Sequence, residues 1–390
     1  MAELLDLGIR NPKFYAAPHE VLRRWRRDDP VHRDDAAQMW VVTRHDDVLA
    51  VLRDPRLFCS SRGVLLGDRE RDIAPGQSIL YLDPPEHSRY RAIVSRQFHG
   101  REVVRLEQRI TALVDELLDV INPGEPFDAV ERLAVPLPLT MIAELLGLHG
   151  SNREQLRAWS DSAIAAAVDP TPESYAHASE VIGHLLEAVA EHRGHPSDDL
   201  IGDLLAAEVD GDKLNEGELL GFCMSLLVAG NETTRQLISG SLRALAEHPA
   251  QWQRLRNDPL LIPTAVEELL RWTTPFIGFA RTATEDCTLG GRDIAAGDYL
   301  LLLHLSANRD EEVFGDNSLD LDLGRDPNPH LSFGFGIHYC LGAGLARMEA
   351  RALLSELVLR FGSVSVAGEP RRLESAFVNG LEELPLVLRT

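Results

Sequence analysis

The chain has 390 residues, and its 39 Lys and Arg against 61 Asp and Glu give a formal net charge of −22 at pH 7. This acidic excess argues against a general nucleic-acid binder or a protein that binds anionic membranes, because both need basic surface. The four cysteines lie far apart and include no Cys-x-x-Cys, so neither a disulfide framework nor a metal cluster is indicated. With no signal peptide and no apolar run that could span a bilayer, we expect a cytoplasmic protein.

No linker, repeat or low-complexity tract divides the chain, so we expect residues 1–390 to form a single domain. The first part predicts short strands at Val31 and over 39–43, then a helix over 46–52. The following segment, 60–80, mixes glycine and proline with apolar residues. Long loops of this kind often cover or bind ligands, although a loosely packed surface loop is the more common explanation.

A proline pair, Pro84-Pro85, precedes a predicted helix that places His87 and Arg91 four residues apart on one face. Two such groups could bind an anion together. The alternative is that they simply face solvent, as basic side chains on a helix more often do. Further helices are predicted over 101–121, 139–148, 152–168 and 173–192.

The longest periodic run, 215–248, predicts one helix of roughly 50 Å that begins with Asn215 and Glu218 in capping-box register. Its middle reads Ala229-Gly230-Asn231-Glu232-Thr233-Thr234. A glycine weakens the turn, and the Thr233 hydroxyl can bond to the carbonyl of Ala229 and bend the axis. A local opening would accommodate a small ligand and water; a kink without function is the alternative.

Another predicted helix, 264–272, places Glu268 and Arg271 one turn apart. An exposed pair of this kind contributes only about 0.2–0.5 kcal/mol. An apolar run, 275–279, then leads to Arg281, and 299–305 is predicted as a strand.

Residues 333–344 put one cysteine, Cys340, in a glycine-rich loop that runs into a predicted helix over 345–359. The free N–H groups at that helix start favour a thiolate. A thiolate beneath a flat cofactor is one way to ligate haem iron. An inert cysteine in a glycine turn is the alternative. Zinc is a poor rival because no second cysteine lies at a ligand spacing, and phosphate-binding glycine motifs are incomplete.

The pattern Phe333-x-x-Gly336-x-x-x-Cys340-x-Gly342, with His338 inside it, resembles the haem-ligand signature of the cytochrome P-450 family. Three further segments resemble the family in the same order: His87 with Arg91, the run 229–234, and Glu268 with Arg271. The resemblance covers essentially the whole chain. It implies a mainly α fold with small β-sheets, in which the haem lies between a long central helix and the helix after the cysteine loop.

The same resemblance implies roles for individual residues. Cys340 would ligate the iron of haem b (iron protoporphyrin IX), while Glu232 and Thr233 would relay protons. Arg325 would complete the buried structural pair of Glu268 and Arg271. The other haem-binding positions would be His87, Arg91, Ala229, Gly230, Arg281, Phe333, Gly334, His338 and Gly342. The substrate pocket, roofed by helices 152–168 and 173–192, would be lined by Val64, Leu65, Leu66, Phe276, Ile277, Phe279 and Val378.

We therefore expect a haem-thiolate monooxygenase that inserts one atom of O2 into an apolar small molecule. The segment 377–385 resembles members that oxidise sterols, terpenoids or fatty acyl chains. A peroxide-driven or C–C coupling oxidase and a non-catalytic haem sensor or partner protein are the alternatives, and Glu232 and Thr233 favour reductive oxygen activation over them.

Only 48 residues follow Gly342, which leaves no room for a fused reductase, so electrons are expected from a separate ferredoxin-type donor with its reductase. Such donors are acidic, and this chain is acidic too. We expect Arg89, Arg96 and Arg101 to form a local basic docking patch.

Overall fold

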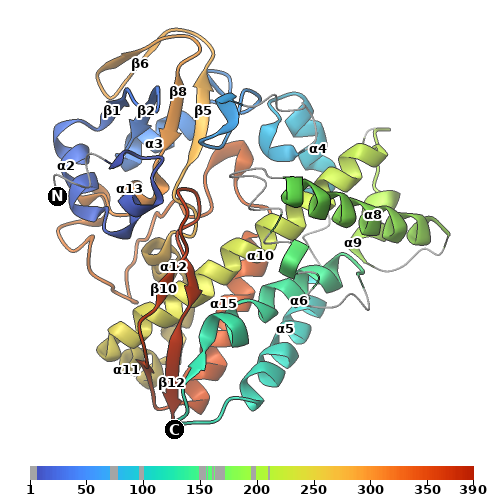
Figure 1. Ribbon diagram of the computed structural model, residues 1–390, viewed down its shortest axis with the longest axis vertical. Helices are drawn as coiled ribbons and strands as arrows, with labels where there is room; N and C mark the ends of the chain where they lie inside the picture. Colours follow the sequence, from blue (N-terminus) through green and yellow to red (C-terminus); the bar gives the residue numbers. More distant parts are fainter. Residues whose placement is uncertain are drawn as a thin grey trace.

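The structure is a computed structural model that describes residues 7–70, 78–95, 101–148, 155, 157–159, 162, 172–194, 199–209 and 211–390. The largest sheet lies at one end of the molecule, strands near the C-terminus reach the opposite end, and long helices fill much of the rest (Figure 1). The predicted helix over 152–168 falls mostly outside the described residues, as do Arg96 and residues 71–77 of the predicted loop.

The largest sheet has five strands in the order β1-β2-β8-β5-β3, and only β2 and β8 pair in parallel. Its strands are β1 (Val31–Asp34), β2 (Met39–Val42), β3 (Phe58–Cys59), β5 (Phe279–Ala283) and β8 (Tyr299–Leu302). The predicted strand over 299–305 ends early, because α13 (His304–Ala307) begins there. The sheet is surrounded by η1 (Pro12–Ala16), α2 (His19–Asp28), α3 (His45–Arg53), α14 (Glu311–Phe314) and the β6–β7 hairpin (Cys287–Leu289 and Arg292–Ile294).

Helix α10 (Glu216–Glu247) is the predicted long helix and crosses the molecule (Figure 1). The capping box is confirmed: the Asn215 side chain accepts from the Glu218 N–H, and the Glu218 side chain accepts from the Asn215 N–H. Helix α10 packs against α6, α12 and α15. The surrounding helices are α4 (Glu86–Ser95), α5 (Arg101–Asp119), α6 (Pro136–Leu145), α8 (Pro172–Gly194), α9 (Leu200–Ala206), α11 (Pro249–Asn257), α12 (Ile262–Thr273) and α15 (Ala343–Arg360).

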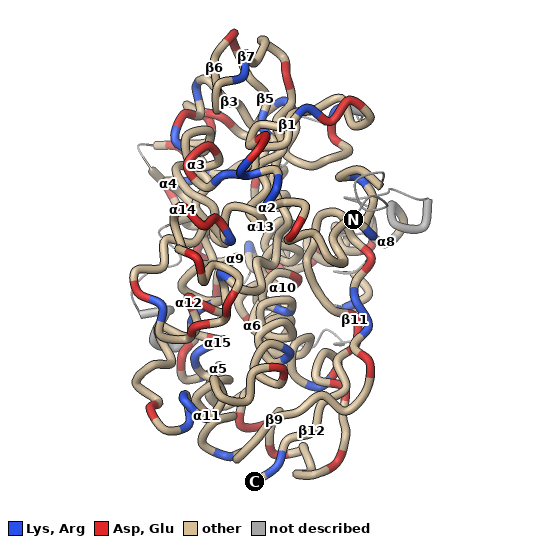
Figure 2. The backbone as a smooth tube through the Cα atoms, turned by 90° about the vertical axis from the view of Figure 1, so that its left-hand side faces the viewer, with Lys and Arg blue, Asp and Glu red and all other residues tan. Residues whose placement is uncertain are grey.

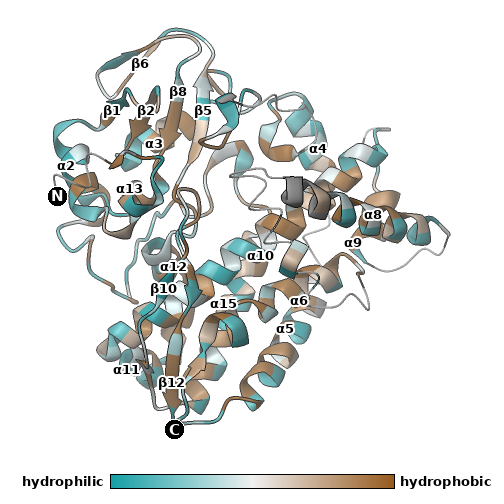
Figure 3. Cartoon of the chain, viewed as in Figure 1, coloured by the Kyte–Doolittle hydropathy of each residue, from teal (hydrophilic) through white to brown (hydrophobic). Residues whose placement is uncertain are grey.

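Three small sheets complete the architecture: β6–β7, the pair β10 (Arg371–Arg372) with β11 (Leu381–Glu383), and the sheet β4-β12-β9. The last contains β4 (Phe127–Asp128), β9 (Ser363–Val366) and β12 (Pro385–Arg389). Hydrophobic residues colour β8 and β12 brown in Figure 3, in agreement with their burial. One large core joins α5, α6, α10, α12 and α15, and two smaller cores lie on the two faces of the five-stranded sheet.

The charges behind the net −22 are distributed over the whole molecule. In the view of Figure 2, basic and acidic residues alternate along the chain instead of separating into two faces. Within the described residues, no helix is both long and apolar enough to cross a membrane.

Candidate functional site

The cysteine loop is closed by backbone contacts that require glycine. The Cys340 N–H donates to the carbonyl of Phe333 at 3.0 Å. Gly336 has φ +71°, and a Cβ there would lie 2.5 Å from the carbonyl oxygen of Leu52 at the end of α3. Only glycine combines this backbone angle with so close an approach. The loop is therefore packed against α3 while Cys340 itself remains exposed.

Two arginines hold the aromatic side chains of this loop. The Arg347 guanidinium, on the second turn of α15, lies 4.4 Å from the ring centre of Phe333 and pairs with Glu267 at 2.7 Å. Arg53 lies 5.3 Å from the ring centre of Phe335. Cation–π contacts of this kind fix ring positions from both sides of the loop.

The thiol of Cys340 does not titrate as the helix start alone predicted. Although Cys340 is exposed to solvent on one side, the protein atoms packed around it desolvate the thiol and raise its pKa, and this outweighs the backbone N–H groups of Gly342 and Ala343 and the charges of Arg91 and Arg347, which lower it. The prediction of a thiolate is thus wrong for the protein chain alone. Coordination to a metal deprotonates a cysteine outright, so a bound metal reverses this preference.

Four basic side chains from distant segments converge beside the loop: His87 and Arg91 from α4, Arg281 from β5, and His338. The rings of His87 and His338 are 4.4 Å apart. Burial, then Arg91, lowers the pKa of His87 to about 4. Burial, then Arg281, lowers that of His338 to about 2. These mutual influences identify one cluster, in which the two arginines carry the positive charge and the two histidines are neutral near pH 7.

The donors of this basic cluster are largely uncommitted within the described residues. The Nε2 atom of His87 is buried without a partner. Arg91 donates to the Tyr339 carbonyl at 2.6 Å, and Arg281 to its neighbour Ala280 at 2.7 Å. Burial lowers the pKa of Arg281 to about 10. The carboxylate of Asp83 acts on His87 and Arg281 electrostatically, while accepting from the N–H groups of Ser60 and Ser61.

Ser60 was not predicted as a site residue, yet its hydroxyl lies 3.1 Å from Nε2 of His338. No sequence pattern links two residues 278 positions apart. The exposed sulfur and the adjacent basic cluster fit a haem: the sulfur suits its iron and the cluster its two carboxylates. Zinc does not fit, because no group of three metal-binding side chains exists among the described residues.

In the middle of α10, the Thr233 hydroxyl donates to the Ala229 carbonyl at 2.8 Å, which is the predicted bond. Ala229 is exposed although most of this helix is buried. Gly230 has a packing reason, because a Cβ there would lie 2.5 Å from the side chain of Ile142 on α6. The glycine therefore brings α6 and α10 together, a role that the sequence did not reveal.

Glu232 is buried and hydrogen-bonded along its own helix. Its Oε1 accepts from Gln236 Nε2 at 2.7 Å, and its Oε2 lies 3.4 Å from Nη1 of Arg235. Sequence reasoning missed Gln236, although a pair four residues apart on a helix is a signal that can be read from the sequence.

The pair Glu268 and Arg271 is fully buried, not exposed. Two bonds of 2.7 Å join the guanidinium to the carboxylate, and Arg325 adds a third group at 3.2 Å. The structure therefore brings together the three residues that the resemblance had grouped.

The apolar positions divide between a candidate pocket and the core. Phe276 and Phe279 have ring centres 5.0 Å apart and surround Phe377, which was not predicted. Val378 pairs with Phe276 as an isolated bridge. Ile277 is instead completely buried in the core of the N-terminal sheet, so its assignment to the pocket is corrected.

The segment that contains Val64, Leu65 and Leu66 is held in place rather than loose. The N–H groups of Val64 and Leu65 both donate to Asp68, and the Val64 carbonyl accepts from Ala280 on β5. Val64 is buried, whereas Leu65 and Leu66 are half-buried.

Arg89 is not part of a free basic surface. It forms an ion pair with Glu218, the second residue of the α10 capping box, and that prediction is corrected. Arg96 and the side chain of Arg101 lie outside the described residues.

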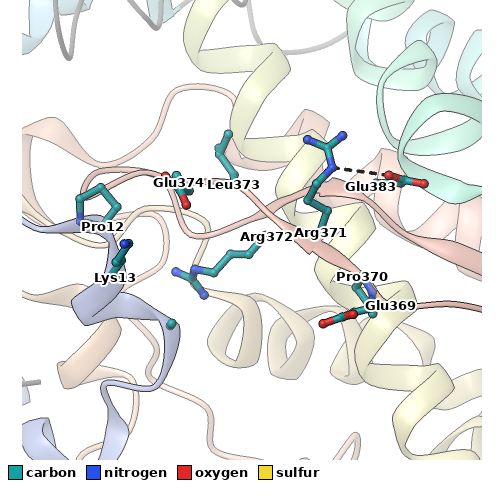
Figure 4. Close-up of a pocket in the computed structure, with 10 residues that line it drawn as sticks. Pro12, Lys13, Glu369, Pro370, Arg371, Arg372, Leu373, Glu374 and Glu383 are labelled. Carbon is teal, nitrogen blue, oxygen red and sulfur yellow. Dashed lines mark hydrogen bonds and ion pairs between the residues drawn. The ribbon is translucent and has the colours of Figure 1, made fainter. Parts of the chain in front are cut away.

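A cavity of about 470 Å³ lies elsewhere, between η1 and the strand β10 (Figure 4). Lys13, Arg371 and Arg372 line it together with Glu369, Glu374 and Glu383, and the Arg371 guanidinium pairs with Glu383. It contains none of the predicted site residues, and its mixed charges do not specify a ligand.

Comparison with known proteins agrees with this geometry. The family model described as Cytochrome P450 matches residues 124–379. Cytochrome P450 109 of Bacillus spizizenii is 38% identical over 389 residues, covering 97% of this chain and 93% of that protein. Methyl-branched lipid omega-hydroxylase of Mycobacterium bovis is 39% identical over 358 residues, covering 89% and 83%.

Solved structures agree over nearly the whole chain. CYP109E1 of Bacillus megaterium, in complex with testosterone, has a TM-score of 0.87 and 34% identity, covering 96% of this chain and 100% of that one. CYP109Q5 of Chondromyces apiculatus has a TM-score of 0.89 and 36% identity, covering 98% of both chains. The chain therefore belongs to the cytochrome P450 family, and it is a haem-binding monooxygenase.

Proposed function

We propose that Cys340 is the iron ligand of this monooxygenase and that the basic cluster of His87, Arg91, Arg281 and His338 holds the haem carboxylates. The supporting observation is that the exposed Cys340 lies beside a buried arginine, Arg281, and a buried histidine, His87, which have few partners of their own among the described residues. When bound, the haem supplies the oxidising chemistry of the family. We further propose that residues 1–390 act as one catalytic unit.

The carbon monoxide spectrum of the ferrous protein tests the assignment of Cys340. The wild type should give the strongly red-shifted band expected of a thiolate-ligated haem, and Cys340→His should abolish it. Cys287→Ser, a change on the half-buried strand β6, is the matched control and should keep the band. A red-shifted band that survives in Cys340→His would refute the assignment.

The protein's own part in the chemistry is to bind, to exclude water and to move protons. Thr233 lies beside the exposed Ala229, and its hydroxyl is fixed by the Ala229 carbonyl. We propose that Thr233 and Glu232 deliver protons during reductive oxygen activation. Thr233→Ala should keep haem and substrate binding but divert reducing equivalents into peroxide. A peroxide-driven enzyme would instead turn over equally well in this variant when supplied with peroxide and no donor.

We propose an apolar ring or chain compound, of the sterol, terpenoid or fatty acyl kind, as substrate. The half-buried aromatic group of Phe276, Phe279 and Phe377 offers apolar surface, from which release of water favours apolar ligands. The testosterone-bound relative is consistent with this class. A spectral titration with steroids, terpenes, fatty acids and a charged sugar tests the proposal. Binding of the sugar alone would reject it.

We propose an acidic ferredoxin-type protein as the electron donor. In place of Arg89, the exposed Arg53 and Arg351 offer positive charge beside the cysteine loop: Arg53 lies over Phe335, and Arg351 follows Arg347 by one turn of α15. Rim charges act mainly on association rate.

Arg53→Glu combined with Arg351→Glu should slow reduction by a ferredoxin several-fold at low salt. The effect should fade at high salt, because screening shortens the range of these charges. Arg292→Glu, on the distant strand β7, should leave the rate of reduction unchanged at both low and high salt. Equal rates for all three proteins at low salt would place the docking face elsewhere.

A further inference from the structure

Gln236 is a fully buried amide in α10 whose two ends are committed to different parts of the molecule. Its Nε2 donates to Oε1 of Glu232 at 2.7 Å, one turn earlier. Its Oε1 accepts from the N–H of Leu381 at 2.8 Å and lies 3.2 Å from the Ser239 hydroxyl. An amide side chain cannot exchange donor for acceptor without losing both contacts, so its orientation is fixed by the pair.

The main chain approaches Gln236 so closely that a side chain would not fit. A Cβ at Gly380 would lie 2.0 Å from Oε1 and 2.1 Å from Cδ of Gln236. Glycine at position 380 therefore allows the backbone N–H of Leu381 to reach the Gln236 amide. The contact is a built feature of the fold rather than a surface side chain that happens to lie nearby.

The segment that carries this N–H also borders the candidate substrate pocket. Phe377 packs against Phe276 with ring centres 4.6 Å apart, and Val378 pairs with Phe276. Asn379 then anchors the chain: its N–H donates to the Pro275 carbonyl and its side chain to the Thr273 carbonyl at 2.6 Å. Only three residues therefore separate the pocket aromatic Phe377 from Leu381, whose N–H bonds to Gln236.

We propose that Gln236 is a positioning residue: it sets the orientation of the Glu232 carboxylate and takes its own position from the pocket segment 377–381. This inference rests on the proposed proton-delivering function of Glu232. Buried hydrogen bonds are strengthened by the low local dielectric. A substrate that displaces Phe377 or Val378 would move the Leu381 N–H, and the amide would transmit that movement to the acid. The Arg235 contact to the other carboxylate oxygen is longer, at 3.4 Å, and lacks this link.

The experiment compares Gln236→Leu, Glu232→Gln and the double variant in the holoenzyme with a reductase system and a substrate found by spectral titration. The measured quantity is product formed per pair of electrons consumed, together with the substrate dissociation constant. Gln251→Leu is the matched control. It removes another amide that bridges a helix to the backbone, through the Leu321 carbonyl, far from Glu232 in the sequence.

Gln236→Leu should lower product per electron pair about fivefold to tenfold, as expected for loss of one hydrogen bond of ordinary strength. Its substrate dissociation constant and haem content should stay within about twofold of wild type, as should every property of the control. The double variant should be no worse than Glu232→Gln, because a residue that acts through Glu232 has no effect once that acid is gone.

Two further variants guard against a simple folding defect. Gln236→Met keeps the length of the side chain but removes the donor to Glu232, and it should show the same loss. Gly380→Ala forces the chain away from the amide and should also lower product per electron pair with little change in substrate affinity.

The outcomes separate the two proposals. If Glu232→Gln is fully coupled, the proton-delivering role itself fails. If Glu232→Gln is uncoupled while Gln236→Leu and Gln236→Met match wild type, only the positioning role fails. If the losses in product per electron pair multiply in the double variant, the positioning role is also overturned. If Gly380→Ala forms as much product per electron pair as wild type, the link to segment 377–381 is refuted.

Discussion

Two buried arginine groups in this protein differ in how completely their donors are used. Arg271 gives every N–H to an acceptor: Glu268 takes two, and the carbonyls of Asn308, Ser318 and Asp320 take the others. Among the described residues, Arg281 in the basic cluster makes one hydrogen bond, to the carbonyl of Ala280. Both guanidiniums are withdrawn from water.

The difference separates a group that completes the fold from one that is built for a ligand. Removing a charge from water is costly unless hydrogen bonds replace the lost hydration. Around Glu268 the protein supplies all of them, and Arg325 and the Asn328 amide add more to the same carboxylate. In the basic cluster the described residues supply few, which supports our proposal that an anionic ligand with two carboxylates binds there.

The largest expected effect comes from breaking the saturated group. Glu268→Gln should lower the free energy of unfolding by about 3–5 kcal/mol, because two buried guanidiniums lose their counter-charge. Denaturant titration measures it. Glu247→Gln, which breaks an exposed pair with Arg243, is the control and should cost less than about 1 kcal/mol. Equal losses in the two variants would mean that Glu268 is not an essential part of the fold.

A smaller and different effect is expected in the basic cluster. Arg281→Met keeps the length of the side chain and removes a desolvated charge, so the free energy of unfolding should change little. Loss of a charge-assisted bond should speed haem release by about tenfold or more, measured as transfer to excess apomyoglobin. Arg292→Met, an exposed change, should leave haem release unaltered. Unchanged release from Arg281→Met would remove this residue from the proposed site.

The smallest effect concerns pH and the surroundings of Arg281. Burial, then the charge of Arg281, lowers the pKa of the nearby His304 to about 4. A histidine whose pKa is lower in the folded state binds fewer protons there than it does in the unfolded chain. Protonation of the unfolded chain does not oppose folding above pH 6.5, so the full free energy of unfolding is present there. Part of that free energy is lost as pH falls from 6.5 toward 4.

Stability should therefore decline between pH 6.5 and 5, by an amount on the order of 1 kcal/mol for this residue. His304→Gln should make that decline shallower, in denaturant titrations at both pH values. Identical pH slopes for the variant and the wild type would show that His304 does not carry the effect.

Much of the site was predictable because its signals are local. The capping box of Asn215 and Glu218 and the bond from Thr233 to Ala229 join residues within one turn of a helix, so their spacing in the sequence fixes their spacing in space. The cysteine loop was predictable for the same reason: glycines at fixed offsets set its path.

The errors arose where a residue's partner lies far along the chain. Arg89 was expected to be free, but Glu218, 129 positions away, pairs with it. Ile277 shares an apolar run with Phe276, yet the extended chain turns its side chain to the opposite side, into the core.

The sequence by itself determined the family, the long central helix, the cysteine loop and the residue types of the site, because motifs and periodicity depend on neighbours in the chain. Only the tertiary structure decided which charges are satisfied. It buried Glu268 among three side chains that donate hydrogen bonds to it. It also left His87 Nε2 without a partner among the described residues and brought the Leu381 N–H against Gln236. Desolvation and hydrogen bonding depend on all the groups packed around an atom, and packing joins segments hundreds of residues apart.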